Sequence, residues 1–334
     1  MTFSRLGETP ELSIVVPCYN EDKVLLETHR RLSAVAAETG LPFELVYIDD
    51  GSRDDTPSVL ANLQMSDPRV RVVVLSRNFG HQVAITAGLN HSRGRAVVVI
   101  DADLQDPPEV IPEMIARWRE GYEVVYGTRR RRDGETAFKT KTAEWFYRLI
   151  NRISEIPIPL DTGDFRLLDR KAVDALASMP ERDRFVRGMV SWVGFRQLAV
   201  IYDRAPREAG ESKYSLLRMF RFAMDGILSF SIAPVRLATF CGLGTVLAAL
   251  LLAAIAAIGR MAGSFQIGPW FAVLLAVFFL GGVQLLCLGV LGEYLGRVYG
   301  ESKRRPLYVV RETRGFDDPL PDRSRTYEVQ VGEP

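Results

Sequence analysis

The chain of 334 residues contains only three cysteines, and their spacing is typical of neither a zinc site nor a disulfide framework. Two of them, Cys241 and Cys287, lie inside long apolar stretches. Net charge is also small, because 42 basic and 41 acidic residues leave a formal charge of +1. Such a balance gives no indication of a nucleic-acid partner, so we expect none and interpret the cysteines as structural.

Two common nucleotide-binding motifs are missing. No G-x-G-x-x-G follows the first apolar run, and the similar letters GLGTVL (242–247) fall inside an apolar stretch. A Walker loop is absent as well, which argues against a dinucleotide-dependent dehydrogenase and a P-loop kinase. The opening segment lacks the basic region and apolar core of a signal peptide, so we expect the N-terminal part to stay in the cytosol.

Charged residues are absent from two stretches in the C-terminal third, 237–259 and 267–292. At a rise of about 1.5 Å per residue, a helix of either length crosses a hydrocarbon core of about 30 Å. A pair of buried core helices would also be apolar. The uninterrupted length and the many small residues favour two transmembrane helices, which we place at 232–259 and 267–293.

Basic residues flank the two apolar stretches and suggest their orientation. The connector between them holds only Arg260, whereas the outer flanks carry Arg218, Arg221, Arg236, Arg297, Lys303, Arg304 and Arg305. The positive-inside rule therefore predicts that both termini and the N-terminal domain are cytosolic. Residues 215–231 place apolar side chains at helical spacing and predict an amphipathic helix at the membrane surface. The tail 294–334 is expected to be cytosolic, and loosely ordered from Arg311.

Short apolar runs alternate with helical patterns in residues 1–214. Continuous apolar runs are typical of parallel strands that are covered on both faces, so the pattern predicts a doubly wound, Rossmann-like α/β domain. The predicted strands are 12–16, 44–48, 71–75, 96–100 and 123–127, and the predicted helices are 22–39, 55–65, 81–92 and 107–120.

Polar and charged side chains follow every predicted strand. The segments read PCYNE, DDGSRDDT, SRNFGH, DADLQD and TRRRR in chain order. In open α/β sheets ligands bind outside the carboxyl ends of the strands. We therefore expect these turns to form one binding site.

Asp101 and Asp103 follow the fourth strand at a spacing of two. If the backbone stays extended, both carboxylates point to one side, where they suit Mg²⁺ or Mn²⁺ with water and phosphate as further ligands. Gln105 could add a neutral oxygen. Such an ion would stabilise a diphosphate leaving group. The alternative is an acidic turn in which Asp106 caps a helix that begins at Pro107, and we adopt it for Asp106 alone.

The first two turns also offer hydrogen-bonding groups. Asp49 and Asp50 could accept hydrogen bonds from a ribose or a base, although an Asx turn with Gly51 would explain them too. Asn20 and Glu21 suit nucleoside contacts or a helix cap.

The turns PCYNE, DDGSRDDT, RNFG and DADLQDPPE, in this order at strand ends, together resemble family-2 glycosyltransferases of the GT-A fold. The resemblance implies a nucleotide-sugar donor held on Mg²⁺ or Mn²⁺ by the Asp-x-Asp at 101–103. The implied metal residues are Asp101, Asp103 and Gln105. The implied donor-binding residues are Pro17, Tyr19, Asn20, Glu21, Asp49, Asp50, Ser52, Asp101 and Ala102.

Further along, DTGDFRLLDRKAV (161–173) resembles the acceptor-side segment of that family. Asp164, beside Arg166, matches an acid near the C1 atom of the sugar and is predicted to be catalytic together with Asp103. A strand start with an internal salt bridge would also explain these letters. FVRGMVSWVGF (185–195) stands where processive synthases carry Gln-x-x-Arg-Trp, and the absence of that motif argues against a polymer-extruding synthase.

The segments RNFGHQVAITAGL, GESKYS and LGEYLGRVYGESKRRPLYVV, with the two apolar stretches, resemble the bacterial polyprenyl-phosphate glycosyltransferases. This resemblance implies inverting transfer of a sugar, with UDP-glucose as the first expectation, to undecaprenyl phosphate at the cytoplasmic membrane. The residues expected to bind the acceptor phosphate are Arg129, Lys139, Lys141, Arg207, Ser212 and Lys213.

Several alternatives stay open at this point. UDP-N-acetylglucosamine, UDP-galactose or GDP-mannose could be the donor, and another lipid such as diacylglycerol could be the acceptor. A non-catalytic, membrane-tethered assembly subunit is the alternative outside enzymes, and a homo-oligomer is compatible with the sequence. A phosphate monoester has a second pKa of about 6 and is largely dianionic at neutral pH, so Asp164 could orient a substrate instead of taking a proton.

Overall fold

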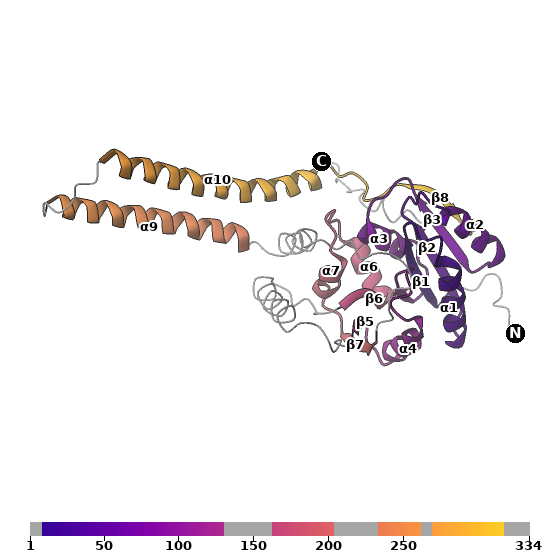
Figure 1. The fold of residues 1–334 in the computed structure, drawn as a ribbon. Coiled ribbons are helices and arrows are strands. Elements are labelled where there is room, and N and C mark those ends of the chain that lie inside the picture. Colours follow the sequence, from indigo (N-terminus) through magenta and orange to yellow (C-terminus); the bar gives the residue numbers. More distant parts are fainter. Residues whose placement is uncertain (1–8, 130–161, 204–232, 262–268, 317–334) are drawn as a thin grey trace, which may run out of the picture. The chain divides into compact units, whose positions relative to one another are not determined.

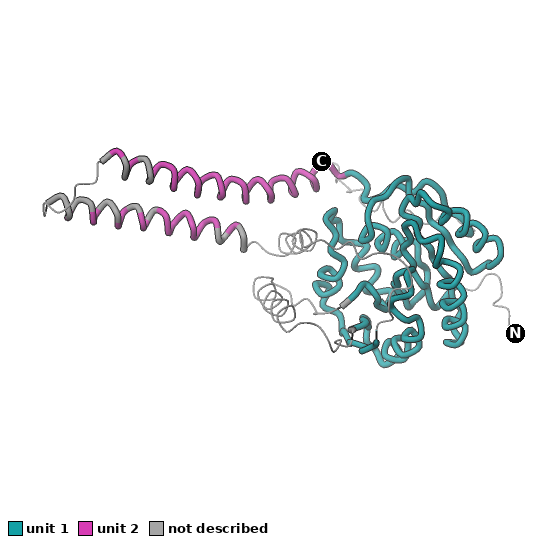
Figure 2. The backbone as a smooth tube through the Cα atoms, in the orientation of Figure 1, with its two compact units in different colours: residues 1–147, 156–214, 305–334 teal, residues 148–155, 215–304 magenta. Residues whose placement is uncertain are grey.

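The computed structural model describes residues 9–129, 162–203, 233–261 and 269–316. The chain divides into two units, shown in different colours in Figure 2. The first comprises residues 1–147, 156–214 and 305–334, and the second comprises residues 148–155 and 215–304. The first unit holds a large sheet with its helices, and the second holds two long helices.

The sheet of the first unit has eight strands in the order β7-β5-β6-β4-β1-β2-β3-β8 (Figure 1). The strands are β1 (Leu12–Cys18), β2 (Phe43–Asp49), β3 (Val70–Leu75), β4 (Ala96–Val99), β5 (Val124–Arg129), β6 (Thr162–Asp169), β7 (Gln197–Tyr202) and β8 (Val310–Arg314). All five predicted strands are confirmed, with shifts of at most two residues at their ends.

The sheet is mixed, whereas the sequence pattern suggested parallel strands only. Strands β1 to β4 are parallel, but β6 pairs antiparallel with both β4 and β5, and β8 pairs antiparallel with β3. A central strand that is buried on both faces has the same continuous apolar run in either direction, so the pattern does not reveal its polarity. Strand β6 is buried in this way, since residues 165–168 are all buried.

The helices of the first unit follow the predicted α/β alternation. They are α1 (Leu25–Glu38), α2 (Thr56–Ser66), α3 (His81–His91), the 3₁₀ helix η1 (Pro108–Val110), α4 (Ile111–Arg119), α6 (Arg170–Ser178) and α7 (Val186–Trp192). Helix α1 buries Leu25, Leu32 and Val35 on one face, as its helical spacing predicts. Helix α3 approaches β1 so closely that a Cβ atom at Gly88 would lie 2.1 Å from the side chain of Val15. This close packing places the start of α3 at the edge of the sheet where the predicted site lies.

The interpretation of Asp106 as a helix cap is wrong. The helical segment begins at Pro108 as a 3₁₀ turn, and no side chain caps it or the following α4. Asp106 is fully buried, and its Oδ1 accepts a hydrogen bond from the hydroxyl of Tyr202, which lies in β7. A partner from a strand almost a hundred positions away could not be read from the local pattern.

The expectation of a loose tail from Arg311 is wrong for residues 311–316. Residues 310–314 form β8, and the chain just before it is tied to β3 through a 2.9 Å hydrogen bond from Ser76 N–H to the carbonyl of Val309. Asn90 Nδ2 also donates to the Tyr308 hydroxyl at 3.1 Å. The edge of β3 has unpaired backbone groups that the returning chain satisfies. The charged sequence VRETR gave no strand signal because a half-exposed edge strand needs no apolar run.

The second unit contains the two helices predicted at 232–259 and 267–293. They are α9 (Ala233–Met261) and α10 (Pro269–Ser302), which lie side by side in Figure 1. The Sγ atom of Cys287 lies 3.4 Å from the carbonyl of Ala238, so the two helices are in contact. Within the described ranges, one stretch, Ala276–Ser302, is long and apolar enough to cross a membrane. The amphipathic helix expected at 215–231 lies outside the described residues.

A glycine pair tests whether the tail segment belongs to the sheet. Gly315 has φ +77° and its Cβ would lie 2.6 Å from the carbonyl of Val70, whereas Gly40 has φ +70° and open space around it. We expect Gly40→Ala to destabilise by about 1–2 kcal/mol from backbone conformation alone. Gly315→Ala should cost about 1–3 kcal/mol more, because of the added clash. Equal losses in chemical unfolding of the two variants would contradict the placement of the tail.

Candidate active site

The loops after β1 and β2 are joined by hydrogen bonds at the carboxyl edge of the sheet. Asn20 N–H donates to Ser52 Oγ at 3.0 Å, and Arg53 N–H donates to Asn20 Oδ1 at 2.9 Å. Glu21 N–H donates to Thr56 Oγ1 at 2.8 Å. Asn20 adopts φ 57°, a left-handed conformation that asparagine tolerates better than most residues. The structure thus brings together three of the predicted donor-binding residues, Asn20, Glu21 and Ser52.

Asp50 anchors the RNFG loop after β3. Its carboxylate accepts hydrogen bonds from Phe79 N–H at 2.7 Å and Gly80 N–H at 2.9 Å. The neighbouring Gly51, with φ +70°, leaves only 2.5 Å between a Cβ atom and the backbone of Arg77, so this tight junction requires glycine. Burial raises the pKa of Asp50 despite these two donors. In the structure Asp50 holds the RNFG loop, and its contact with a nucleotide-sugar stays a prediction.

The two carboxylate oxygens of Asp49 differ in their hydrogen bonding. Its Oδ1 accepts from Ser52 N–H at 2.9 Å, which is the Asx-type turn considered from the sequence. Its Oδ2 is buried and has no hydrogen-bond partner within the described part of the chain. A buried acceptor of this kind suits a ligand N–H or O–H group.

The remaining predicted donor residues differ in their exposure. Pro17 lies within β1 and is buried, and Ala102 is buried with its carbonyl accepting from the Thr28 hydroxyl at 2.7 Å. Tyr19 is exposed to 41 % and stands at the end of β1, where its ring can meet a ligand. Contact of Pro17, Tyr19 and Ala102 with the nucleotide-sugar stays a prediction.

The backbone at 101–105 turns, so the expectation of an extended segment is wrong. Strand β4 ends at Val99, Leu104 has φ 56°, and Gln105 N–H donates to Asp103 Oδ1 at 3.1 Å. Asp101 Oδ1 is buried without a hydrogen-bond donor among the described residues, and His81 Nε2 lies 3.5 Å away. Burial and the nearby acids raise the pKa of Asp101 to about 6, against the opposing effect of His81.

These carboxylates fit a divalent cation. The described residues contain no group of three or more His, Cys, Asp or Glu side chains that could enclose a metal ion. Mg²⁺ is commonly bound by one or two carboxylates, with water and substrate phosphates as its other ligands. Asp101, with its unmet buried oxygen, and Asp103 match that pattern, and Gln105 as a third ligand stays a prediction.

Asp164 lies in β6 and is almost fully buried, with a side chain that is 7 % exposed. Its Oδ1 accepts from Arg187 Nε at 2.8 Å. Its Oδ2 lies 3.1 Å from His81 Nε2, 3.2 Å from Gln82 Nε2 and 3.3 Å from Arg187 Nη2. Arg166 Nη2 is 3.8 Å from Oδ1, so the internal salt bridge considered from the sequence is present. The carboxylate of Asp164, which was predicted to be catalytic, is therefore surrounded by hydrogen-bond donors.

The donors decide the ionisation of Asp164. Burial alone would raise the pKa of this carboxyl, but the hydrogen bond from His81 and the charges of Arg187 and Arg166 hold it well below its usual range. Burial alone would lower the pKa of His81, but Asp164 and Asp101 outweigh it and raise that pKa. Asp164 is therefore a carboxylate with a low affinity for a proton, which makes it a weak general base at neutral pH.

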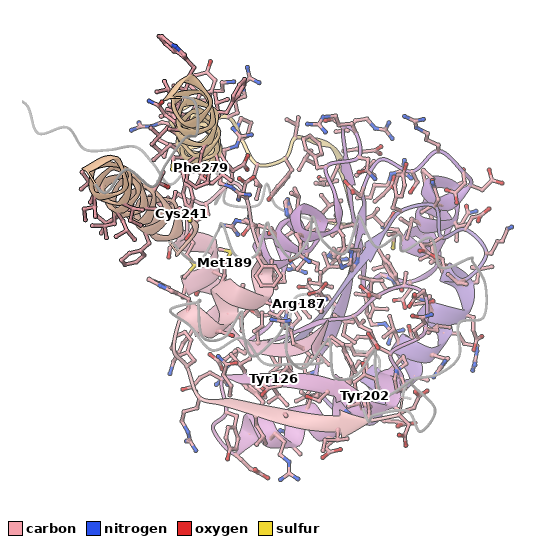
Figure 3. The ribbon with its side chains drawn as sticks, turned by 60° about the vertical axis from the view of Figure 1, so that its left-hand side comes forward. Tyr126, Arg187, Met189, Tyr202, Cys241 and Phe279 are labelled. Atoms are coloured by element: carbon pink, nitrogen blue, oxygen red, sulfur yellow. The ribbon has the colours of Figure 1, made fainter. Side chains whose placement is uncertain are left out.

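A small open hollow lies on the α7 side of β5, β6 and β7. Arg166 and Arg187 both line it, and Figure 3 shows Arg187 on α7 above the strands that carry Tyr126 and Tyr202. The Nε atom of Arg166 is buried without a hydrogen-bond partner in the described structure. The hollow is also lined by Val124, Tyr126, Val190, Ser191 and Gln197. Two guanidinium groups thus share the single carboxylate of Asp164.

His81, Gln82 and Arg187 were not predicted as site residues. His81 and Gln82 directly follow the RNFG turn, so their place at a strand end was an available signal. Arg187 had no such signal, because only the packing of α7 against β6 brings it to Asp164, 23 positions earlier in the chain.

The residues predicted to bind the acceptor phosphate are mostly outside the described part of the chain. Arg129 is the last residue of β5, where its backbone pairs with Tyr202. Lys139, Lys141, Arg207, Ser212 and Lys213 lie outside the described residues.

The ionised state of Asp164 predicts a pH-dependent stability. The depressed pKa means that its carboxylate favours the folded state above the value of about 3.9 expected when unfolded, and that this contribution is lost as the pH falls further. The share of His81, whose pKa is raised, is complete below about pH 6.5 and is lost as the pH rises through the raised value.

Asp164→Asn should lower the free energy of unfolding by about 3–5 kcal/mol, because it leaves Arg166 and Arg187 without their counter-charge. Chemical unfolding of the wild type and the variant should show that this difference becomes smaller as the pH falls below about 4. A difference that stays constant below that pH would contradict the assignment.

Solved structures show limited similarity to this chain. Glucosyl-3-phosphoglycerate synthase from Mycobacterium tuberculosis, in complex with Mn²⁺, UDP and glucosyl-3-phosphoglycerate, is 20 % identical with a TM-score of 0.45, and the match covers 68 % of this chain and 84 % of that one. The mannosyltransferase PcManGT from Pyrobaculum calidifontis, in complex with GDP-Man and Mn²⁺, is 17 % identical with a TM-score of 0.44, covering 84 % and 88 %.

Sequence relatives are much more similar. The glycosyltransferase YkcC of Bacillus subtilis (strain 168), described as uncharacterized, is 48 % identical over 92 % of this chain and 95 % of its own. The bactoprenol glucosyl transferase of Shigella phage SfV is 41 % identical over 91 % of this chain and 99 % of its own. The model of glycosyl transferase family 2 matches residues 13–177, which include the loops and acids described above. The chain therefore belongs to glycosyl transferase family 2, and it is a glycosyltransferase with the mixed α/β sheet of the GT-A fold.

Proposed function

We propose that this glycosyltransferase moves a sugar, UDP-glucose being the first candidate donor, to a polyprenyl phosphate at the cytosolic face of a membrane, with inversion at the anomeric carbon. The observation that carries the proposal is the convergence of two acidic sites on His81. Its Nε2 lies 3.1 Å from Asp164 and 3.5 Å from Asp101. The acid proposed to bind the metal and the buried acid Asp164 would therefore both lie within reach of one bound substrate.

The donor would occupy the edge formed by the first three loops. Tyr19 and the unmet oxygen of Asp49 are suited to the nucleoside, and the RNFG loop is fixed against them by Asp50. Asp101 and Asp103 would hold Mg²⁺ or Mn²⁺ next to the diphosphate. A divalent cation, when bound there, would offset the charge of the departing nucleoside diphosphate.

The acceptor is proposed from the relatives and from the second unit. A relative that is 41 % identical along nearly its whole length is named a bactoprenol glucosyl transferase. Helices α9 and α10 would form a membrane hairpin with both ends in the cytosol, supported by the apolar stretch Ala276–Ser302 and by the basic residues at their outer flanks. Arg129, Lys139, Lys141, Arg207, Ser212 and Lys213 stay our candidates for binding the lipid phosphate.

The residues beside Asp164 suggest how attack would occur. A lipid phosphate monoester is largely dianionic at neutral pH, since its second pKa is about 6, and so can attack without losing a proton to the protein. Asp164, ionised and held by His81, Gln82 and Arg187, would act as a fixed hydrogen-bond acceptor for a sugar hydroxyl. Arg166, which lines the hollow beside α7, would attract the incoming phosphate by its charge.

A donor and acceptor panel tests the proposed function. Purified protein in detergent would be mixed with UDP-glucose, UDP-N-acetylglucosamine, UDP-galactose or GDP-mannose, each with radiolabelled undecaprenyl phosphate or with diacylglycerol. We expect lipid-linked sugar from UDP-glucose and undecaprenyl phosphate. Transfer only to diacylglycerol would contradict the proposed acceptor, and the absence of transfer in every pairing would favour a non-catalytic assembly role.

The role of Asp103 in metal binding gives a sharper prediction. Asp103→Ala should abolish the transfer that depends on Mg²⁺ or Mn²⁺, by at least about 10²-fold, because the cation loses one of its two carboxylates. The matched control is Asp174→Ala, since Asp174 is a half-exposed acid on α6 that lies 3.8 Å from Arg170 and outside the predicted site. Full activity of Asp103→Ala, or of the wild type in excess chelator, would contradict the metal site.

A further inference from the structure

The carboxylate of Asp164 is held by side chains from two helices that start next to it. Gln82 is the second residue of α3 and Arg187 is the second residue of α7. Together with His81 they contribute four short donor–acceptor distances, between 2.8 and 3.3 Å, to the two carboxylate oxygens. Both oxygens are engaged, so the plane of the carboxylate is fixed by its neighbours.

Gln82 makes one hydrogen bond to Asp164 and a second one to the backbone of α7. Its Nε2 donates to Asp164 Oδ2 at 3.2 Å, while its Oε1 accepts from Val186 N–H at 3.1 Å. A backbone N–H on one side and a carboxylate on the other require one acceptor and one donor, and a primary amide supplies both. Gln82 therefore joins the first turn of α7 to the acid in β6.

Arg187 holds the same acid from the opposite helix. Its Nε and Nη2 reach both oxygens of Asp164, at 2.8 and 3.3 Å, in the forked geometry that lysine cannot copy. Its side chain is 28 % exposed and lines the hollow beside α7, whereas Asp164 is 7 % exposed. The guanidinium group thus connects the buried acid to the open side of the site.

A purely structural ion cluster is the simpler interpretation, and energetics argue against it. Buried ion pairs add little net stability compared with apolar residues of similar size. Their better-attested value is a defined geometry, and the carboxylate in question stands 3.1 Å from the histidine that also faces Asp101. We propose that Gln82 and Arg187 are positioning residues, which hold Asp164 in the orientation that glycosyl transfer requires. The proposal rests on the function proposed above.

Steady-state kinetics of three variants in the full-length protein test this. Gln82→Glu keeps the shape and the acceptor for Val186 N–H but places a like charge beside Asp164. Arg187→Lys keeps the charge but loses the fork, and Arg187→Ala loses both. We expect kcat to fall about 10–100-fold in Gln82→Glu, about 10-fold in Arg187→Lys and about 100-fold in Arg187→Ala, with each KM within about threefold of the wild type.

Controls separate positioning from folding. The thermal midpoint of each variant shows whether it is folded, and if Arg187→Ala is not, Gln82→Glu and Arg187→Lys decide. Arg117→Ala is the matched control, because Arg117 is a half-exposed arginine on α4 that pairs only with Glu113 and Glu120 in the described contacts. It should keep kcat within about twofold, as expected for a surface ion pair.

Two results would overturn the proposal. The first is a kcat of Gln82→Glu within about twofold of the wild type, which would leave only the structural link to Val186. The second is a raised KM for the lipid with unchanged kcat in Arg187→Lys, which would make Arg187 a lipid-binding residue.

Failure of the proposed function has a different signature. In that case the wild type transfers no sugar to polyprenyl phosphate, and the same variants are then compared by the rate at which they hydrolyse the nucleotide-sugar to free sugar. If the hydrolysis rates of the variants fall in the same order as predicted for kcat, the positioning role is supported. Equal hydrolysis rates in all of the variants would overturn it.

Discussion

The site depends on the buried carboxylate of Asp164, which accepts hydrogen bonds from several side chains. Asp164 has a side chain that is 7 % exposed, yet it stays ionised because His81, Gln82 and Arg187 all donate to it. A buried charge without such partners would be neutralised by protonation. The neighbouring Arg166 adds a second guanidinium group, so this part of the site carries more positive than negative charge. That excess fits a reaction in which a phosphate arrives and a diphosphate departs.

The fold explains how residues so far apart in sequence meet at this carboxylate. Strand β6 is inserted antiparallel between β4 and β5, which carries Asp164 next to the end of β4 and its acids. Helix α3 packs on β1 through Gly88 closely enough to bring His81 and Gln82 over the same edge. Helix α7 then covers β5 and β6 and supplies Arg187. Each of these contacts is a property of packing and not of a local motif.

The sequence was informative wherever structure is local. The five strands and their helices were predicted within a few residues, because parallel strands have continuous apolar runs and end at polar turns. Asp101 and Asp103 were singled out by their place after a strand, and Asp164 by the resemblance of its segment to family-2 glycosyltransferases. The sequence pattern did not reveal contacts between residues that lie far apart along the chain. These are the hydrogen bond from Tyr202 to Asp106, the pairing of β8 with β3, and the contact of Arg187 with Asp164. The turn at Leu104 was missed because a single left-handed residue leaves no pattern.

The central claim is that Asp164 works as a fixed anion and not as a proton acceptor. Difference infrared spectroscopy of the wild type against Asp164→Asn measures this directly, since a carboxylate and a protonated carboxyl absorb at different frequencies. We predict that the Asp164 band stays that of a carboxylate as the pH is lowered from about 8 to about 3.5, which is below the usual aspartate pKa of about 3.9. A protonated carboxyl band that appears within this range would contradict the account.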